Sequence, residues 1–290
     1  MYSWRFFLRK QSVGKISEHG YSCFNKGMSN SRLISIAAGV IPELMDNPVH
    51  FIENAASAGW KGTGVWFDPS SWTKRTTQEV AKRIEDSGLV AVDMEVIRIG
   101  AEIDHGEALI EAAIAVGAKN ILAISSYDSK EQTAERLTEL CSLASDANIC
   151  VCLEFMRFTS IKNLSDALAT VDLVEADNIG ILPDLIHVHR SGTTYDEISL
   201  TEKSLFPYVQ WCDAKMDPIG WAHKDLLTDA LDDRMIPGEG ELSVREFESL
   251  FAPDVPFSIE VRSKDLREAF PDFKDRAKYL LDRTLAALPI

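Results

Sequence analysis

Ile149-Cys-Val-Cys-Leu-Glu154 and Ile179-Gly-Ile-Leu-Pro-Asp184 are two short apolar runs, and each of them ends in a carboxylate. Apolar runs of this length with β-branched residues predict buried strands. Burying an unpaired acid costs several kcal/mol, so each acid should pair with a cation, bind a metal or face a cleft. The ends of these two strands are therefore where we look for chemistry.

The rest of the chain repeats a strand-then-helix rhythm around these two runs. Helix boundaries are marked by Asn47-Pro48, by Ser129 and by a capping box of Ser243 and Glu246. Strict alternation predicts a parallel sheet, and eight units over about 260 residues predict a closed (β/α)₈ TIM barrel. An open doubly wound sheet is less consistent, because no G-x-G-x-x-G turn follows the first strand. The predicted strands are residues 33–37, 64–67, 90–96, 120–124, 149–154, 179–184, 208–212 and 257–261.

Composition narrows the classes of partner. The 290 residues carry a net charge of −15, although residues 1–32 hold six Lys or Arg and one acid. Because the remainder is so acidic, we expect no nucleic-acid partner and no membrane surface. No apolar run approaches the roughly 20 residues of a membrane span. We expect a basic, disordered extension over residues 1–30 and the barrel over residues 31–290.

The cysteines indicate a compartment rather than a site. There are five, an odd number, and they show no metal-ligand spacing. Buried free thiols in a reducing cytoplasm are the expected state.

Oxygen-bearing side chains end four consecutive predicted strands. Glu154, Asp184, Gln210 and Glu260 occupy these positions, and Asp213 follows Gln210 closely. In a barrel the carboxyl ends of the strands meet at one face, where active sites form. Carboxylates and an amide carbonyl favour a hard cation such as Mg²⁺ or Mn²⁺.

These positions resemble the sugar phosphate isomerase/epimerase family of xylose isomerase-like barrels. The resemblance covers residues 31–290 and lies in five short motifs in the same order. It implies that the metal is held by Glu154, Asp184, Gln210 and Glu260, and that His187 faces the substrate. The motifs are Leu153-Glu154-Phe, Asp184-x-x-His187-x-x-x-Ser191-Gly192, Val209-Gln210-Trp-Cys-Asp213, Arg234-Met-Ile-Pro237-Gly238-Glu239-Gly240-Glu241 and Ser258-Ile-Glu260-Val.

The implied reaction is proton abstraction next to a carbonyl of a small sugar or polyol, through a metal-stabilised enediolate. Glu154 and Glu260 would act as base and acid on opposite faces of the carbon. Arg234 would hold a distal hydroxyl or an anionic group, and Trp66 would line the pocket. Barrels of this family are often homo-oligomers, but no interface is evident in the sequence.

Gln210 keeps the type of reaction open, because many sugar epimerases of the family have His there. Some relatives with Gln, including 3-dehydroshikimate dehydratases, are lyases. A metal-dependent lyase acting on a cyclic hydroxy-ketone is therefore the alternative to an isomerase or epimerase. An abasic-site endonuclease of the same superfamily would need a three-zinc site with several histidines. Only His187 and His189 of the six histidines lie near predicted strand ends, and the acidic body also argues against DNA. A non-catalytic binding barrel is a further alternative.

Other polar residues near strand ends have simpler expectations. Glu95 should face the cavity or pair with Arg98, and Ser125 and Ser126 could contact the substrate. His189 and Arg190 should form the solvated start of a helix. His223 lies in a long connection, residues 213–242, and should be structural or exposed.

Overall fold

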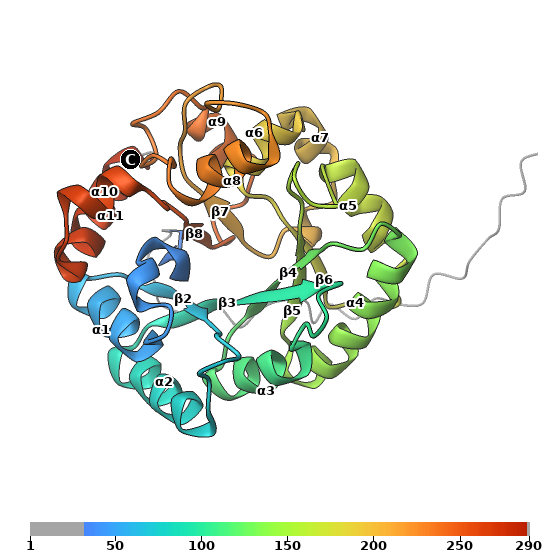
Figure 1. The fold of residues 1–290 in the computed structure, drawn as a ribbon, viewed down its shortest axis with the longest axis horizontal. Coiled ribbons are helices and arrows are strands. Elements are labelled where there is room, and N and C mark those ends of the chain that lie inside the picture. The colour runs from blue at the N-terminus through green and yellow to red at the C-terminus, as the bar shows by residue number, and fades with distance from the viewer. Residues whose placement is uncertain (1–31, 289–290) are drawn as a thin grey trace, which may run out of the picture. The chain divides into compact units, whose positions relative to one another are not determined.

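The computed structural model describes residues 32–288, and its centre is an eight-stranded parallel sheet surrounded by helices (Figure 1). This confirms the predicted TIM barrel. The strands are β1 Ile34–Ile36, β2 Gly62–Trp66, β3 Val90–Ile99, β4 Asn120–Ser125, β5 Cys150–Glu154, β6 Ile179–Leu182, β7 Val209–Trp211 and β8 Phe257–Ile259.

The helices follow the strands in the predicted alternation, with extra short helices late in the chain. The α-helices are α1 Pro48–Ala58, α2 Lys74–Ser87, α3 Gly106–Val116, α4 Lys130–Ala144, α5 Leu164–Val171, α6 Leu185–Ser191, α7 Tyr195–Leu200, α8 His223–Leu231, α9 Val244–Ser249, α10 Lys264–Ala269 and α11 Phe273–Ala287. Short 3₁₀ turns are η1 Ala38–Val40, η2 Pro42–Leu44, η3 Ser145–Ala147 and η4 Lys203–Leu205.

The order of the strands is β6-β5-β4-β3-β2-β1-β8-β7, so a seam lies between β6 and β7. The seam is bridged by one parallel pairing, Asp184 with Gln210. There the Gln210 backbone N–H donates to the Pro183 carbonyl over 3.2 Å. Pro183 itself has no N–H to extend the ladder, which helps to end β6 at Leu182. Two predicted site residues thus face each other where the barrel closes.

Local sequence signals explain the early helices. The Asn47 side chain accepts from the His50 N–H at 3.2 Å, Pro48 occupies the first helical position, and Gly59 ends α1 in the left-handed region. Ser129 caps α4 in the same way through the Gln132 N–H. The caps predicted at Asn47 and Ser129 are confirmed.

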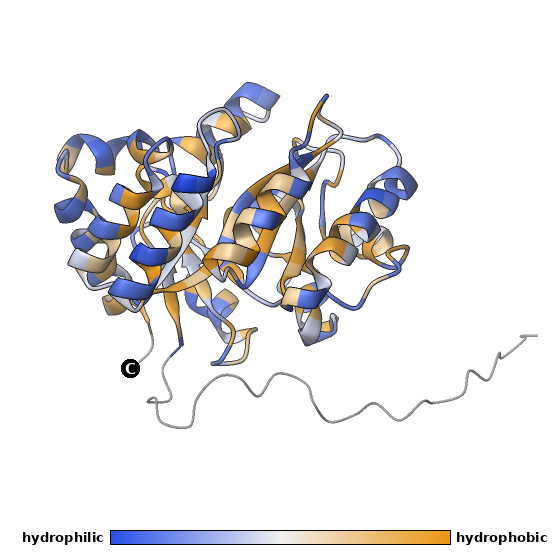
Figure 2. Ribbon diagram, turned by 90° about the horizontal axis from the view of Figure 1, so that it is seen from below, coloured by the Kyte–Doolittle hydropathy of each residue, from blue (hydrophilic) through white to orange (hydrophobic). Residues whose placement is uncertain are grey.

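Two apolar layers surround the strands, because successive side chains of a strand point to opposite faces. On β5, Val151 and Leu153 pack in the large cluster that includes the helices. Cys150 and Cys152 belong to a smaller cluster on the other face, with Leu182 among others. Figure 2 shows the strands in hydrophobic colours and many helical turns in hydrophilic ones.

The late part of the chain differs from the prediction in three ways. The connection 213–242 contains α8, which buries Leu226 and Ala230. Two further short helices, α6 and α10, follow β6 and β8 directly. Ser243 occupies the N-cap of α9, but its side chain makes no capping hydrogen bond, so the predicted capping box is wrong. Short helices of six to nine residues give too few turns for a clear sequence periodicity.

The predicted basic extension lies outside the described residues, as does Cys23. The four described cysteines are free and buried, as expected. Over residues 32–288, none of the helices is both long and apolar enough to cross a membrane.

Candidate active site and metal centre

Three buried side chains meet at the carboxyl ends of β5 and β6. Glu154 ends β5, Asp184 caps α6 just after β6, and His187 lies one turn into α6. One ligand atom from each lies within 4.8 Å of the others. His187 Nε2 is 4.0 Å from Glu154 Oε1 and 3.8 Å from Asp184 Oδ2. The structure therefore brings together three of the side chains that the sequence placed at the site.

Arg234 links this group to Glu260, which directly follows β8. Its Nη1 lies 2.6 Å from Asp184 Oδ2 and its Nη2 lies 3.1 Å from Glu260 Oε2. Its Nε donates to the Ala230 carbonyl over 2.7 Å. Both ends of the guanidinium thus contact predicted metal ligands, so the geometry gives Arg234 an orienting role in addition to the substrate contact, which stays a prediction.

Gln210 is fully buried, and neither polar atom of its amide has a partner among the described residues. Buried amides in folded proteins are almost always hydrogen-bonded, so this orphaned group indicates a missing partner. A carbonyl oxygen that faces a cation would satisfy Oε1. This observation fits a metal ligand at Gln210.

The charges of the cluster fit a divalent cation. Glu154, Asp184 and Glu260 carry three negative charges when ionised, and Arg234 supplies one positive charge. The two remaining negative charges match one divalent ion, as expected when a bound metal is the largest local charge.

Burial explains the pKa shifts of the cluster. It raises the pKa of Glu154 well above its usual value, and the charges of Asp184 and Glu260 add to this effect. It also raises the pKa of Glu260, against the opposing charge of Arg234. The pKa of His187 falls to about 3, mainly through burial and secondly through Arg234. The neutral imidazole therefore keeps a free lone pair for a ligand.

A second pair of acids lies on β3. Asp93 and Glu95 are both buried, and Asp93 Oδ1 and Oδ2 and Glu95 Oε1 have no partner among the described residues. Burial raises both pKa values, that of Asp93 to about 8. Glu95 faces inward, as one alternative predicted, rather than pairing with the exposed Arg98. Asp93 was missed, although its spacing of two from Glu95 places both on one face.

Of the remaining predicted residues, Trp66 and His223 have neighbours in or near the site, whereas Ser125 has a structural contact. Trp66 is half-buried beside Glu95 in the β2–β3 register, and its role in the pocket stays a prediction. Phe158 contacts the ring of His187 edge-on at 5.6 Å and that of the exposed His223 at 5.9 Å. Ser125 bonds to Thr133 at 2.7 Å, which indicates a structural role.

Arg190 is buried, so the predicted solvated helix start is wrong there. Its Nε lies 2.8 Å from Asp229 Oδ2, and its other nitrogens donate to the carbonyls of Lys215 and Met216. The ion pair ties α6 to α8. The partner was hidden because Asp229 lies in the unpredicted helix.

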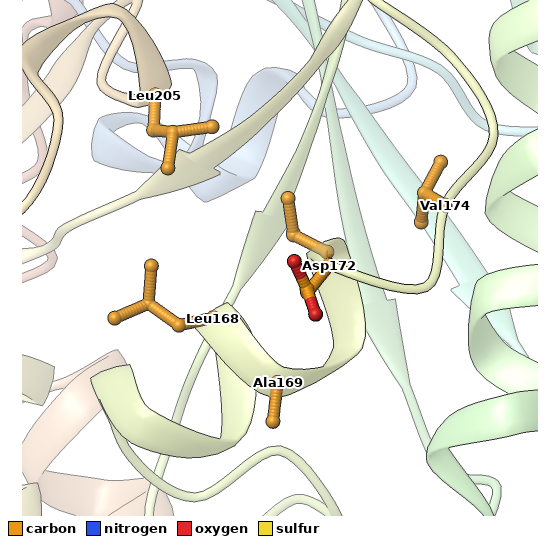
Figure 3. A pocket seen from close by; sticks show the side chains of 6 residues that line it. Leu168, Ala169, Asp172, Val174 and Leu205 are labelled. Atoms are coloured by element: carbon orange, nitrogen blue, oxygen red, sulfur yellow. The ribbon is translucent and has the colours of Figure 1, made fainter. Parts of the chain in front are cut away.

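A surface pocket of about 560 Å³ lies elsewhere, between α5 and η4 (Figure 3). Its lining is aliphatic except for Asp172. Neither a second polar group nor a site residue contributes to it. The pocket therefore carries no chemistry, and the strand ends remain the candidate site.

Fold and site together define a TIM-barrel protein with a buried acidic centre at the carboxyl ends of its strands. Residues 52–282 match the family described as xylose isomerase-like TIM barrel, and the chain belongs to that family. This confirms the resemblance inferred from the motifs.

Individual relatives are distant. The chain is 27% identical over 153 residues to inosose isomerase of Bacillus velezensis, which covers 49% of this chain and 52% of the relative. The chain thus spans about half the length of the curated relatives it matches. Among solved structures, the IOLI protein with a bound zinc atom has a TM-score of 0.71 at 16% identity, covering 89% of this chain and 99% of that one. A probable 3-DHS dehydratase, AsbF of Bacillus anthracis, has a TM-score of 0.62 at 16% identity, covering 86% and 98%.

Proposed function

We propose that this chain is a divalent-metal-dependent isomerase or epimerase of a small sugar or polyol. The observation that carries the proposal is the buried group of Glu154, Asp184 and His187, whose ligand atoms lie within 4.8 Å of one another. The inosose isomerase relatives support the same class of reaction. The free buried cysteines fit the cytoplasm as its compartment.

The metal would be held by Glu154, Asp184, Gln210 and Glu260. When bound, it supplies Lewis-acid stabilisation of the negative charge that develops on the substrate oxygens. These oxygen ligands favour Mn²⁺ or Mg²⁺. His187 faces the same space as Glu154 and Asp184, which suits a contact with the substrate beside the metal.

The chain's own groups would move the proton. One of the carboxylates, Glu154 or Glu260, takes the proton from the carbon next to the carbonyl, and the other returns a proton on the opposite face. Burial raises the pKa of both carboxyls, the direction that suits a group that takes up and returns a proton. Neutral His187 donates a hydrogen bond to a substrate oxygen, while Arg234 holds Asp184 and Glu260 in place.

Product analysis in D₂O tests this proposal. The purified protein would be stripped with a chelator, reloaded with Mn²⁺, Mg²⁺ or Zn²⁺, and incubated with inososes and ketohexoses. We expect metal-dependent deuterium incorporation next to the carbonyl, together with an epimer or isomer. Neither exchange nor product with any metal would overturn the proposal.

Gln210 supports a second candidate, a metal-dependent lyase. Loss of a β-hydroxyl from the same enediolate would give an unsaturated ketone instead of an epimer. Adding 3-dehydroshikimate and related ring hydroxy-ketones to the same panel separates the two. An absorbance from a new conjugated product would identify the lyase.

A further inference from the structure

A layer of buried polar side chains lies inside the barrel, just below the candidate metal centre. Their polar side-chain atoms are fully buried, and none of them has a partner among residues 32–288. The layer consists of Ser35 on β1, Asp93 on β3, Tyr208 and Gln210 at β7, and Ser258 on β8. So many orphaned groups in one place indicate that ordered water connects them.

The strand register places three members of this layer side by side, with Gly62 next to them. Gln210 pairs with Ser258, Ser258 pairs with Ser35, and Ser35 pairs with Gly62. Because these partners sit opposite one another in parallel ladders, their side chains point to the same face. They form one row across β7, β8, β1 and β2.

Asp93 approaches this row across β2. Gly64 pairs with Asp93, and a Cβ added at Gly64 would lie only 3.4 Å from Asp93 Oδ1. A Cβ at Gly62 would meet the Ser35 Cβ at 2.9 Å. The two glycines therefore keep the space open between Asp93 and the serines, which any larger side chain on β2 would fill.

The chemistry of the layer is complementary. The Ser35, Ser258 and Tyr208 hydroxyls and the Gln210 amide can each donate a hydrogen bond. Asp93 is the one carboxyl of the layer, and its two oxygens offer about four lone-pair directions. An ionised carboxyl can only accept, so within this layer the oxygens of Asp93 can be satisfied only by these hydroxyl and amide donors or by water.

We propose that Asp93 is a positioning residue for Gln210: through one ordered water it accepts from the Gln210 Nε2–H, and so turns Oε1 toward the cation. This rests on the proposed function, in which Gln210 is a metal ligand. Metal ligands are commonly oriented by such a second hydrogen bond, whose loss weakens metal binding. In this arrangement the hydroxyls of Ser35, Ser258 and Tyr208 hold the carboxyl of Asp93 in place through ordered water.

The orienting bond does not depend on the charge of Asp93. Burial, and after it the charge of Glu260, raises the pKa of Asp93 to about 8. Whether protonated or ionised, the group keeps an oxygen that accepts from an amide N–H.

Metal affinity of chelator-stripped protein tests the inference, measured by titration calorimetry with Mn²⁺. Asp93→Leu, similar in size but without an acceptor, should weaken Mn²⁺ binding about 10- to 100-fold. Asp93→Asn, which keeps a carbonyl oxygen, should recover most of the affinity. Thr63→Val is the matched control, because Thr63 is a buried hydroxyl on β2 that already bonds to the Gly64 carbonyl. It should leave the affinity unchanged.

A double-mutant cycle with Gln210→Ala shows whether Asp93 acts through Gln210. In that background Asp93→Leu should change the Mn²⁺ affinity less than about twofold, since the ligand it orients is gone. An equal loss in both backgrounds, or no loss in the single variant, would overturn the inference. If the wild-type protein binds no metal, both the proposed function and this inference are overturned.

A crystal structure of the wild-type protein with Mn²⁺ decides the matter if Asp93→Leu does not fold. Nε2 of Gln210 within about 3.5 Å of Asp93, or bridged to it by one water, supports the inference. A different acceptor for Nε2 refutes it.

Discussion

Two acids at the ends of barrel strands, Asp213 and Glu154, are both buried but have opposite surroundings. Within the described part of the chain the Glu154 carboxylate accepts no hydrogen bond, and its approach to His187 Nε2 is 4.0 Å. Asp213 is saturated with backbone donors, two on each oxygen. These donors are the N–H groups of Ala214 at 2.8 Å, Leu242 at 3.0 Å, Gly238 at 3.0 Å and Gly240 at 2.9 Å.

The difference separates two kinds of buried acid. In a filled acid the protein's own donors satisfy both carboxylate oxygens, whereas an available acid has oxygens that are free to bind a ligand. Asp213 uses its full capacity to hold the loop of residues 237–242, so its burial is compensated within the fold. Glu154 has spare capacity and a raised pKa, which costs stability unless a ligand completes it. Unfilled capacity, more than burial or position, marks the candidate site.

Glu154→Gln should have the largest effect on activity. Loss of the carboxylate removes a proton carrier and a ligand, so kcat/KM should fall by a factor of about 10³ or more. The melting temperature of the metal-free protein should stay level or rise, because a poorly compensated buried acid is removed. Steady-state kinetics and calorimetry check both. The exposed Glu111→Gln on α3 serves as the control, and a stability loss without an activity loss would contradict the comparison.

Asp213→Asn should have the opposite effect, a loss of stability with little change at the metal site. An amide keeps one acceptor oxygen and turns an NH₂ group toward two backbone donors, so we expect a loss of about 2–4 kcal/mol in the free energy of unfolding. Urea titration measures it. The Mn²⁺ affinity of the folded protein should change little, and a large loss of metal binding at unchanged stability would place Asp213 in the site.

Gly238→Ala should weaken the same loop by a smaller amount. Gly238 has φ +87°, and a Cβ there would meet Ala287 Cβ at an acceptable 3.5 Å. The cost is therefore backbone strain of about 1–2 kcal/mol rather than a clash. Gly238→Asn, which tolerates positive φ better, should lose less. Equal losses for both variants in urea titrations would show that the strain is not the cause.

The sequence predicts the barrel because its signals are local. Apolar runs, the cap at Asn47 and the strand-helix alternation each lie within a few residues, and the strand ends indicate Glu154, Asp184 and Glu260. Short helices such as α8 are not predicted in this way, because six to nine residues are too few to show a clear helical periodicity.

The number of hydrogen bonds that each acid accepts depends on residues that are distant in the sequence, so the sequence alone could not show it. Arg234 reaches Asp184 across 50 residues, and the two meet only because the barrel closes at that seam. The row of Gln210, Ser258 and Ser35 likewise depends on register. Four backbone donors converge on Asp213 from positions up to 29 residues away. Whether an acid is filled or available follows from these tertiary contacts.

Asp104 extends the comparison to pH, with the smallest expected effect. It is a filled acid near the surface: the Arg136 guanidinium bonds to both oxygens at 2.8 and 2.9 Å, and the Gly106 N–H donates at 3.0 Å. Arg136 therefore lowers the pKa of Asp104 below 3.8. Such a group stabilises the fold above its unfolded pKa, and the stabilisation disappears as the pH falls through the folded value.

Asp104→Asn should accordingly cost about 1 kcal/mol or less at pH 7, after allowance for solvent screening, and progressively less as the pH falls below 3.8. For Glu154 we expect the stability difference between wild type and variant to change with pH in the opposite direction. Because the pKa of Glu154 is raised in the folded state, the metal-free wild type should lose stability relative to Glu154→Gln as the pH rises above 4.5. Urea titrations of the three proteins from pH 3 to pH 8 measure both slopes. Slopes of the same sign would contradict the distinction between filled and available acids, whereas opposite signs would locate the available acid without any substrate in hand.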